Sequence, residues 1–383
     1  MQYFNFDPYS LPPEAEELRK EVRAFLKEEL ADYPAVLRSR SWSGKSAEFS
    51  RKVGARGWIG MTWPRKYGGA ERSFFERYAF LEEVLAYGAP VGGHWIADRQ
   101  SGPTVMRFGT EEQCHRVLPG IIKGESFFCI GMSEPDSGSD LASIRTKAVK
   151  TDGGYVINGS KIWTTGAESC DWMIALVRTG SNPENRHQGM SQFLIDLKNS
   201  KGLTISPIKN MAGEEHFNMV VFEDVFVPDE NLIGAEGDGW KQVTAELAFE
   251  RAGPERYMSS IQLLIEIIRE AKLQPDTRAQ EQIGRLVAHL ATMRRMSISV
   301  AGKLETDSNP ALEASVVKDL GAVYEQAIPE IAHRIGRGEA SMTALSDFEQ
   351  VRAYLTQAVV SFSLRGGTRE ILRGIIARGL GLR

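Results

Sequence analysis

Residues 129–166 hold the densest group of side chains and free backbone groups that could bind a cofactor. The first part, 132–140, is rich in turn-forming residues and offers the hydroxyls of Ser133 and Ser139. Gly138 keeps neighbouring backbone N–H groups out of a regular ladder, so that they are available to a ligand. Hydroxyls and free N–H groups together suit the polar edge of a ring or a phosphate-bearing chain.

The second part of this stretch adds a flat aromatic side chain beside a hydroxyl. A tight turn at 152–154 precedes an alternating run, and the Asn-Gly pair at 158–159 predicts a hairpin turn before 161–165. Trp163 and Thr165 lie two residues apart, so a strand places both on one face. That pairing suits a planar cofactor with a polar edge. The alternative is an ordinary hairpin whose tryptophan lies in the core.

The bulk composition is that of a soluble globular protein. The chain has 383 residues, of which 42% are hydrophobic and 25% charged, so a sizeable core spread over two or three domains is expected. A net charge of −4 disfavours nucleic acid as a partner. No apolar run reaches the roughly 18 residues of a membrane span, and the first residues do not form a secretory signal. The spacing of Cys114, Cys129 and Cys170 predicts reduced thiols, no metal site and a cytoplasmic location.

Helical periodicity dominates the first third of the chain. Residues 13–30 begin with proline and acidic residues and carry apolar residues at helical spacing, which predicts an amphipathic helix. Thr110 and Gln113 form a capping-box pattern at the start of another helix. The helices expected in this region cover 13–30, 46–56, 73–87, 95–108 and 110–123.

The hydrophobic period changes to two between about residues 126 and 233, and then returns to the helical value. We expect an antiparallel barrel or sandwich with strands at 127–133, 144–150, 155–158, 161–165, 172–177, 192–196, 203–208 and 217–227. A polar loop at 180–190 is expected to be mobile. An antiparallel bundle is expected to follow, with helices at 239–272, 276–305, 310–336, 347–365 and from 368. The predicted domains are 1–124, 125–236 and 237–383.

Two motifs in residues 129–166 resemble the flavin-contacting stretch of the acyl-CoA dehydrogenase family. They read S-E-P-D-S-G-S-D at 133–140 and Y-V-I-N-G-S-K-I-W-T-T at 155–165. The resemblance covers nearly the whole chain and includes G-W, W-P and Y-G-G within 57–69, F-G-T-E-E-Q at 108–113, F-E-D-V-F-V-P-D-E-N-L-I-G at 222–234 and G-G-T-R-E-I-L-R-G-I-I-A-R-G-L-G at 366–381. It implies an α+β multidomain fold with an N-terminal α-helical domain, a middle antiparallel β-barrel or sandwich, and a C-terminal four-helix bundle.

The resemblance also implies FAD as the cofactor and assigns contacts to it. The residues expected at FAD are Ile130, Met132 and Ser133 at its polar edge, Gly138 and Ser139 at the phosphates or the acyl-CoA chain, Trp163 and Thr165 at the isoalloxazine and its N5, and Thr368 and Glu370 from the last helix. For the substrate, Arg251 is expected to line the pocket, and Ser139 and the backbone N–H of Gly366 to contact the acyl-CoA, the latter at its thioester carbonyl. The Thr368 hydroxyl can instead cap its own helix.

Dehydrogenation of a thioester requires a carboxylate that removes the α-proton and an electron-poor acceptor for the β-hydrogen, which in this family is the flavin. Many members carry that carboxylate in a C-terminal E-G-T motif, which here reads Gly366-Gly367-Thr368. Members similar to the isovaleryl and long-chain branches place it in a Glu-Arg pair on the first bundle helix, where this chain has Glu250-Arg251. The resemblance therefore assigns the catalytic base to Glu250.

The residues alone leave another interpretation of Glu250 and Arg251 open, which is a solvated ion pair on the surface of an amphipathic helix. Pro254 favours the catalytic interpretation. Because Pro254 has no N–H, the Glu250 carbonyl loses its helical partner and the helix is expected to bend there. A bend opposite a glycine leaves room for a pocket.

Two elements that supply cofactor contacts from a neighbouring subunit in the family are incomplete here. The R-x-x-F-G element is replaced by 276–282, which lacks F-G but keeps Arg278 near a cofactor phosphate as a weak candidate. The Q-x-x-G-G-x-G element is reduced to I-G-R-G at 335–338. A basic stripe either faces cofactor phosphates or is a solvated face, and consists of Arg365, Arg369 and Arg373.

The expected function is FAD-dependent dehydrogenation of an acyl-CoA to a 2,3-trans-enoyl-CoA, with an electron-transfer flavoprotein as the acceptor. The chain is similar to bacterial members that act on bulky, steroid- or ring-derived acyl-CoAs. A homo- or hetero-oligomer, either a dimer or a tetramer, is expected. Two alternatives stay open, which are a cofactor-poor or non-catalytic subunit that needs a sister chain, and a flavin oxidase or monooxygenase of the same fold.

Overall fold

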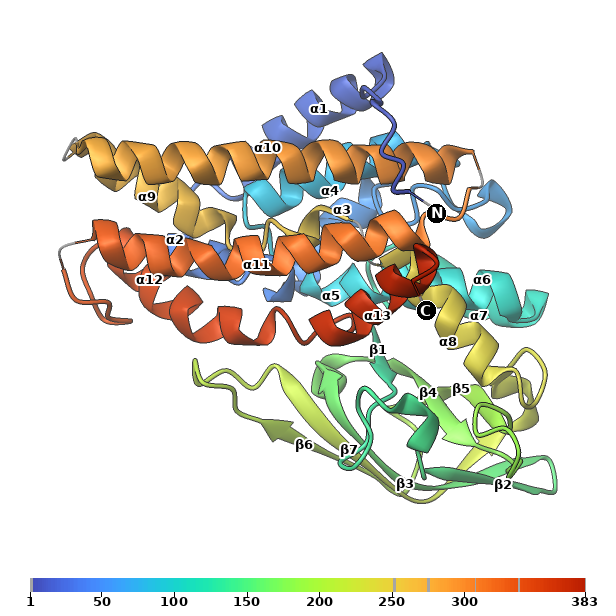
Figure 1. The fold of residues 1–383 in the computed structure, drawn as a ribbon. Helices are drawn as coiled ribbons and strands as arrows, with labels where there is room; N and C mark the ends of the chain where they lie inside the picture. The colour runs from blue at the N-terminus through green and yellow to red at the C-terminus, as the bar shows by residue number, and fades with distance from the viewer. Residues whose placement is uncertain (1–2, 251–252, 274–275, 307, 337, 383) are drawn as a thin grey trace. The chain divides into compact units, whose positions relative to one another are not determined.

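The computed structural model describes residues 3–250, 253–273, 276–306, 308–336 and 338–382, without the side chains of 246–250. The chain forms two compact units (Figure 1). The helical unit comprises Met1–Lys45, Arg72–Val91 and Ala248–Arg383, and the sheet unit comprises Ser46–Glu71 and Gly92–Leu247. Among the described residues, no helix combines the length and apolarity that a membrane crossing requires. The predicted three-domain boundaries stay a prediction.

The helical unit is a bundle in which α9, α10, α11 and α12 pack beside one another, with α4 on α10 and α1 on α4 (Figure 1). α1 buries the apolar face that its sequence predicts, including Leu18, Val22 and Phe25. The helices of this unit are α1 (Pro13–Glu29), α2 (Ala35–Arg38), α4 (Phe74–Ala86), α9 (Ile261–Leu273), α10 (Thr277–Glu305), α11 (Ala311–Ile335), α12 (Asp347–Ala358) and α13 (Arg369–Gly379).

The predicted continuous helix at 239–272 is wrong. α8 (Gly239–Glu250) ends where the bend was expected, a 3-10 turn follows at Pro254–Arg256, and α9 starts at Ile261. Proline at the start of the turn explains the interruption, because it donates no hydrogen bond and fixes its own backbone. The predicted helix at 347–365 is also shorter, since α12 gives way to a 3-10 turn at Val359–Ser361.

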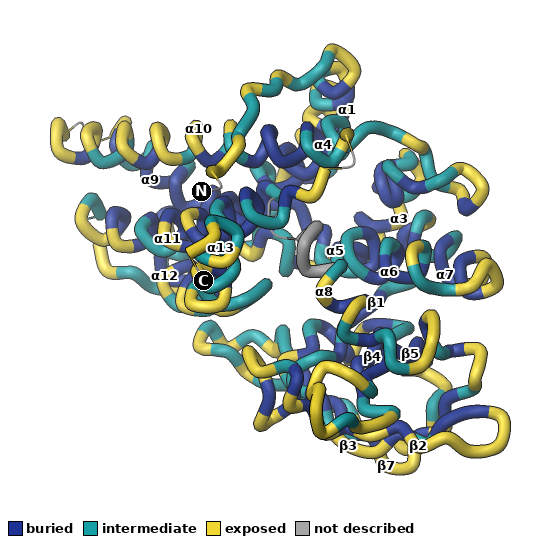
Figure 2. Tube along the Cα trace, turned by 45° about the vertical axis from the view of Figure 1, so that its right-hand side comes forward, coloured by how far each residue is buried: buried dark blue, intermediate teal, exposed yellow. Residues whose placement is uncertain are grey.

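The sheet unit contains one eight-stranded sheet in the order β6-β7-β3-β2-β4-β5-β8, with β1 paired to β4. Most neighbours are antiparallel as expected, but β1 runs parallel to β4, and β2 and β4 share one parallel pair. Buried residues run almost continuously along β4 and β5 (Figure 2). The strands are β1 (Phe128–Gly131), β2 (Lys147–Thr151), β3 (Gly154–Thr165), β4 (Trp172–Arg178), β5 (Met190–Asp196), β6 (Leu203–Ile208), β7 (Phe217–Pro228) and β8 (Leu232–Ile233).

Short helices accompany this sheet, namely α3 (Ala47–Ala55), α5 (Gly92–Ile96), α6 (Gly102–Phe108), α7 (Glu111–Ile122) and the start of α8. The capping box at the start of α7 is confirmed, because Thr110 and Gln113 exchange side chain-to-backbone hydrogen bonds. The predicted helix at 95–108 is instead divided by a π-helical turn at Ala97–Ser101.

The hairpin turn predicted at 158–159 is wrong, because β3 is a single strand that continues through it. The register with β7 shifts between Ile157 and Gly159, which is a bulge rather than a chain reversal. Gly159 has φ +141°, and a Cβ there would lie 2.6 Å from the Thr146 hydroxyl. The glycine therefore serves a close approach between strands, whereas the tight turn at Gly153 does join β2 to β3.

Candidate functional site

The two halves of the predicted cofactor-binding stretch lie side by side in the sheet unit. The loop after β1 closes on itself, since the backbones of Glu134 and Ser137 hydrogen-bond to each other in both directions. The N–H of Ile162 on β3 donates to the carbonyl of Ser133 at 2.9 Å. Ser133 and its neighbours on β1 are thereby brought next to Trp163 and Thr165.

Trp163 lies in a second bulge of β3. Lys161 pairs with Val220 and Thr164 with Asn218, so three steps along β3 match two along β7. Trp163 takes a left-handed backbone conformation, with φ +59°, which is rare for a bulky residue.

The bulge presents the tryptophan outwards. Its side chain is 55% exposed and touches Phe217 edge-on, with ring centroids 5.9 Å apart. Thr164 is fully buried, while Trp163 and Thr165 on either side of it are not. The two predicted flavin contacts therefore lie away from the core, and the alternative of a core tryptophan is wrong.

The phosphate candidates Gly138 and Ser139 form the exposed end of the same loop, and a Cβ at Gly138 would meet no atom within 4 Å. Nearby, Asp140 forms an ion pair with Arg186, which belongs to the polar loop predicted at 180–190. Arg178 also holds that loop by donating to the Gln188 carbonyl at 2.8 Å. Backbone and side-chain bonds thus fasten the polar loop to the cofactor-binding stretch.

A buried ion pair beneath this stretch was missed from the sequence. Lys161 Nζ lies 2.8 Å from Glu134 Oε1, and the lysine side chain has no exposed surface. Burial lowers the pKa of Lys161 to about 8, against the opposing effect of the Glu134 charge. Burial also disfavours the Glu134 carboxylate, but Lys161 and backbone N–H groups outweigh it and lower its pKa. Both residues belong to the motifs at 133–140 and 155–165, and this shared membership is the sequence feature that could have indicated the pair.

In the helical unit, Gly366 and Gly367 form a left-handed turn before α13, with φ +65° and +95°. A Cβ at Gly366 would lie 3.0 Å from a terminal nitrogen of the Arg256 guanidinium. Arg256 is buried, and its Nε lies 3.4 Å from Glu255. Sequence reasoning missed Arg256, although Glu255-Arg256 is a second Glu-Arg pair directly after Pro254.

The candidate residues on α8 and α13 have different outcomes. The Glu250 side chain and all of Arg251 lie outside the described residues, so their roles stay predictions. Thr368 does cap α13, because its hydroxyl accepts from the Ile371 N–H at 3.4 Å. Glu370 is exposed in the first turn, where its own N–H and the Thr368 hydroxyl lower its pKa.

The arginines of the basic stripe pair with carboxylates of α11, and a contact of this stripe with cofactor phosphates stays a prediction. Arg369 Nε lies 2.7 Å from Asp319 Oδ1, and Arg373 Nε lies 3.6 Å from Asp319 Oδ2. Arg365 Nη2 lies 3.3 Å from Glu325 Oε2. Arg278, the weak phosphate candidate, lies exposed in the first turn of α10, and its role stays a prediction.

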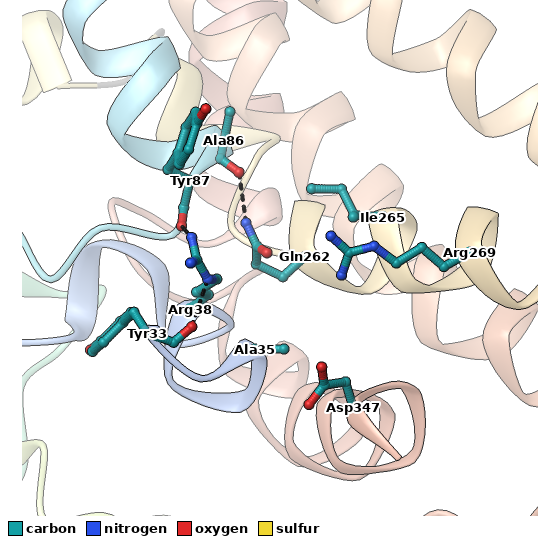
Figure 3. A pocket seen from close by; sticks show the side chains of 9 residues that line it. All are labelled: Tyr33, Ala35, Arg38, Ala86, Tyr87, Gln262, Ile265, Arg269 and Asp347. Atoms are coloured by element: carbon teal, nitrogen blue, oxygen red, sulfur yellow. Dashed lines mark hydrogen bonds between the residues drawn. The ribbon is translucent and has the colours of Figure 1, made fainter. Parts of the chain in front are cut away.

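A pocket of about 500 Å³ opens in the helical unit between α2, α4, α9 and α12 (Figure 3). Its polar side chains serve the protein itself. Arg38 donates to the carbonyls of Tyr33 and Tyr87, and Gln262 donates to that of Ala86. Among the described residues, none of the predicted site residues lines this pocket, and we assign it no function.

Comparison with known proteins identifies the class to which these features belong. Family models for the N-terminal and middle domains of acyl-CoA dehydrogenases match residues 12–125 and 129–225. Acyl-CoA dehydrogenase IpdE1 of Mycobacterium tuberculosis is 34% identical over 96% of this chain and 98% of its own length. Acyl-CoA dehydrogenase FadE34 of the same organism is 33% identical over 85% of this chain, which spans 44% of the longer relative. The chain belongs to the acyl-CoA dehydrogenase family, whose members are flavoprotein oxidoreductases.

Solved structures agree with that assignment. The structure described as the Tcur3481-Tcur3483 steroid ACAD matches with a TM-score of 0.85 and 31% identity over 98% of both chains. The ChsE4-ChsE5 complex from Mycobacterium tuberculosis matches with a TM-score of 0.83 and 30% identity, over 98% of this chain and 99% of that chain. The predicted fold class of N-terminal helices, a middle sheet and C-terminal helices is confirmed.

Proposed function

We propose that this chain catalyses FAD-dependent dehydrogenation of an acyl-CoA thioester to a 2,3-enoyl-CoA. The observation that carries the proposal is the outward-facing Trp163, which a bulge of β3 holds beside the loop of Ser133. An exposed indole next to two hydroxyl-bearing residues fits a planar ring with a polar edge. Family membership supplies the class of reaction.

The described residues fit FAD in their chemistry. Ser133 and Thr165 are partly exposed hydroxyls at the loop and the strand, and Trp163 offers an apolar face that excludes water. Gly138 and Ser139 offer an exposed backbone to phosphates, with open space around Gly138. The backbone at Ile130 and Met132 is assigned to the polar edge of the flavin, and the family resemblance assigns Thr368 and Glu370 to the cofactor as well. When bound, FAD supplies the acceptor for the hydride that leaves the substrate β-carbon.

We assign removal of the substrate's α-proton to Glu250. Gly366 stands where many relatives carry the base, and both its positive φ and the nearby Arg256 guanidinium oppose a larger side chain there. A carboxylate at the end of α8 removes the proton from the α-carbon, and the electron pair of that C–H bond forms the new double bond. The Gly366 N–H donates to the thioester carbonyl, where negative charge develops, and Arg251 lines the substrate pocket.

The substrate class we propose is bulky acyl-CoA thioesters, and an electron-transfer flavoprotein is the proposed acceptor. A similar structure, the Tcur3481-Tcur3483 steroid ACAD, supports the bulky class for this chain. The test is an anaerobic titration of the purified yellow protein with straight, branched and ring-bearing acyl-CoAs. We expect the visible absorption band of the oxidised flavin to bleach with the ring-bearing class. Bleaching by none of them would contradict the proposal.

A second candidate function is a subunit that completes its flavin site only with a sister chain. The lack of the F-G pair in 276–282 favours it. The names of the two similar structures, Tcur3481-Tcur3483 and ChsE4-ChsE5, each join two proteins and also favour it. The colour of the purified chain distinguishes this candidate function from the first. A colourless chain that becomes yellow only when it is produced together with a homologous chain supports the second candidate.

A further inference from the structure

We infer that Glu134 and Lys161 are positioning residues, and that their buried ion pair holds the two halves of the flavin site in register. The inference rests on the proposed function for the identity of the ligand. Neither residue is assigned to the cofactor or the substrate. Their role follows from what each side chain holds in place.

Lys161 connects the carboxylate to the loop after β1. Its Nζ donates to Glu134 Oε1 at 2.8 Å and to the carbonyl of Met132 at 3.1 Å. Met132 directly precedes Ser133, so one ammonium fixes both the charged side chain and the backbone beside the proposed polar edge. Charge-assisted hydrogen bonds of this kind are stronger than neutral ones.

Glu134 in turn gathers donors from the opposite end of its loop. Its Oε2 accepts from the Arg145 N–H at 2.6 Å, and its Oε1 accepts from the Thr146 N–H at 3.0 Å. The residues between Glu134 and Arg145 include Gly138 and Ser139, the proposed phosphate contacts. The carboxylate therefore closes the base of the whole loop that carries these contacts.

The same pair adjoins the bulge that presents Trp163. Lys161 is the last residue of β3 in register before the bulge, and Ile162 donates to Ser133 from within it. A left-handed conformation at a bulky residue persists only where the surroundings fix it. Lys161 and the hydrogen bond from Ile162 to the Ser133 carbonyl hold the two residues that precede Trp163, so loss of the ammonium weakens the hold on both the bulge and the loop.

The alternative is that the pair only stabilises the fold. Removal of one partner leaves a buried, uncompensated charge, and this destabilises a protein whatever the local function. The double variant Glu134→Gln with Lys161→Met separates the two roles, because it leaves no buried charge but also no anchor. Lys303 and Glu313, 2.7 Å apart and largely buried in the helical unit, form a matched control pair.

The experiment measures FAD affinity, the visible spectrum of the bound flavin and the unfolding temperature of the apoprotein for K161M, E134Q, the double variant and K303M. We expect K161M and the double variant to weaken FAD binding about tenfold or more, the lower end of what loss of a residue that orients a metal ligand costs, and to shift the flavin bands. K303M should lower the unfolding temperature but leave FAD affinity and the bands unchanged. Should K161M not fold, the isosteric E134Q and the double variant carry the test.

A folded double variant with native FAD affinity and native flavin bands overturns the inference and leaves the proposed function standing. If E134Q and K161M both bind FAD with native affinity, the inference is likewise overturned and the proposed function still stands. If the unaltered protein takes up no FAD at all, the proposed function falls together with the inference. The two failures are therefore distinguishable from the behaviour of the unaltered protein.

Discussion

At the scale of single residues, His94 shows how a buried titratable group ties stability to pH. Its Nδ1 lies 2.9 Å from the Ser50 hydroxyl, and the ring is buried in the sheet unit. Burial lowers the pKa of His94 to about 4, and the nearby Asp98 opposes that shift only partly. The histidine is therefore neutral in the folded protein at any pH near neutrality.

The sign of the resulting pH dependence follows from proton counts. Below pH 6.5 the unfolded chain protonates this histidine, whereas the folded chain does not until about pH 4, so stability is lost as the pH falls between these values. From pH 7 to pH 5 the loss attributable to His94 is about 2 kcal/mol. We expect His94→Asn to lose that part of the slope in urea unfolding of the apoprotein. An identical slope in the variant would contradict the buried neutral state.

At the scale of elements, the sequence predicted features that depend on nearby residues, such as an apolar helix face and a capping box. It did not predict features that depend on residues distant in the sequence. The apolar face of α1 and the capping box of α7 depend on residues within four positions, and both were predicted. The 158–159 pair was misread as a turn because Gly159 serves contact with Thr146, which is distant in sequence. The Glu134–Lys161 ion pair likewise joins residues 27 positions apart.

The candidate site follows the same division, because its motifs were predicted and its long-range contacts were not. Both motif halves were found, and they do lie together at Ser133 and Trp163. The bulge that turns Trp163 outwards depends on register with β7, which no local pattern contains. Arg256 beside Gly366 escaped detection for the same reason, because the two residues meet only after the bundle forms.

Two glycines of the helical unit give opposite predictions for the same substitution. Gly366→Ala should destabilise the apoprotein by about 1–2 kcal/mol, because its φ is +65° and the new Cβ meets Arg256. Gly284→Ala, within α10 and with open space around its Cβ, should stabilise it by about 1 kcal/mol. Urea unfolding of both variants checks the pair. Equal effects in the two variants would show that the turn before α13 does not require glycine.

At the scale of the whole molecule, the residues to which we assign the chemistry belong to two compact units. The sheet unit carries the proposed flavin contacts on β1, β3 and the loop between β1 and β2. The helical unit carries the end of α8 and the glycine turn before α13, to which the base and the carbonyl donor are assigned. Complementary departures from the common family pattern, a glycine at 366 and a glutamate at 250, are the basis for that division.

The central claim is that Glu250 removes the α-proton while the flavin is reduced. The most direct measurement is the anaerobic rate of flavin reduction by acyl-CoA in Glu250→Gln, with Glu281→Gln, an exposed carboxylate of α10, as the control. We expect the Glu250 variant to keep its flavin but to reduce it at least about 100-fold more slowly, the lower end of general-base contributions. The control should behave as the unaltered protein. Near-normal reduction in Glu250→Gln would contradict the assignment.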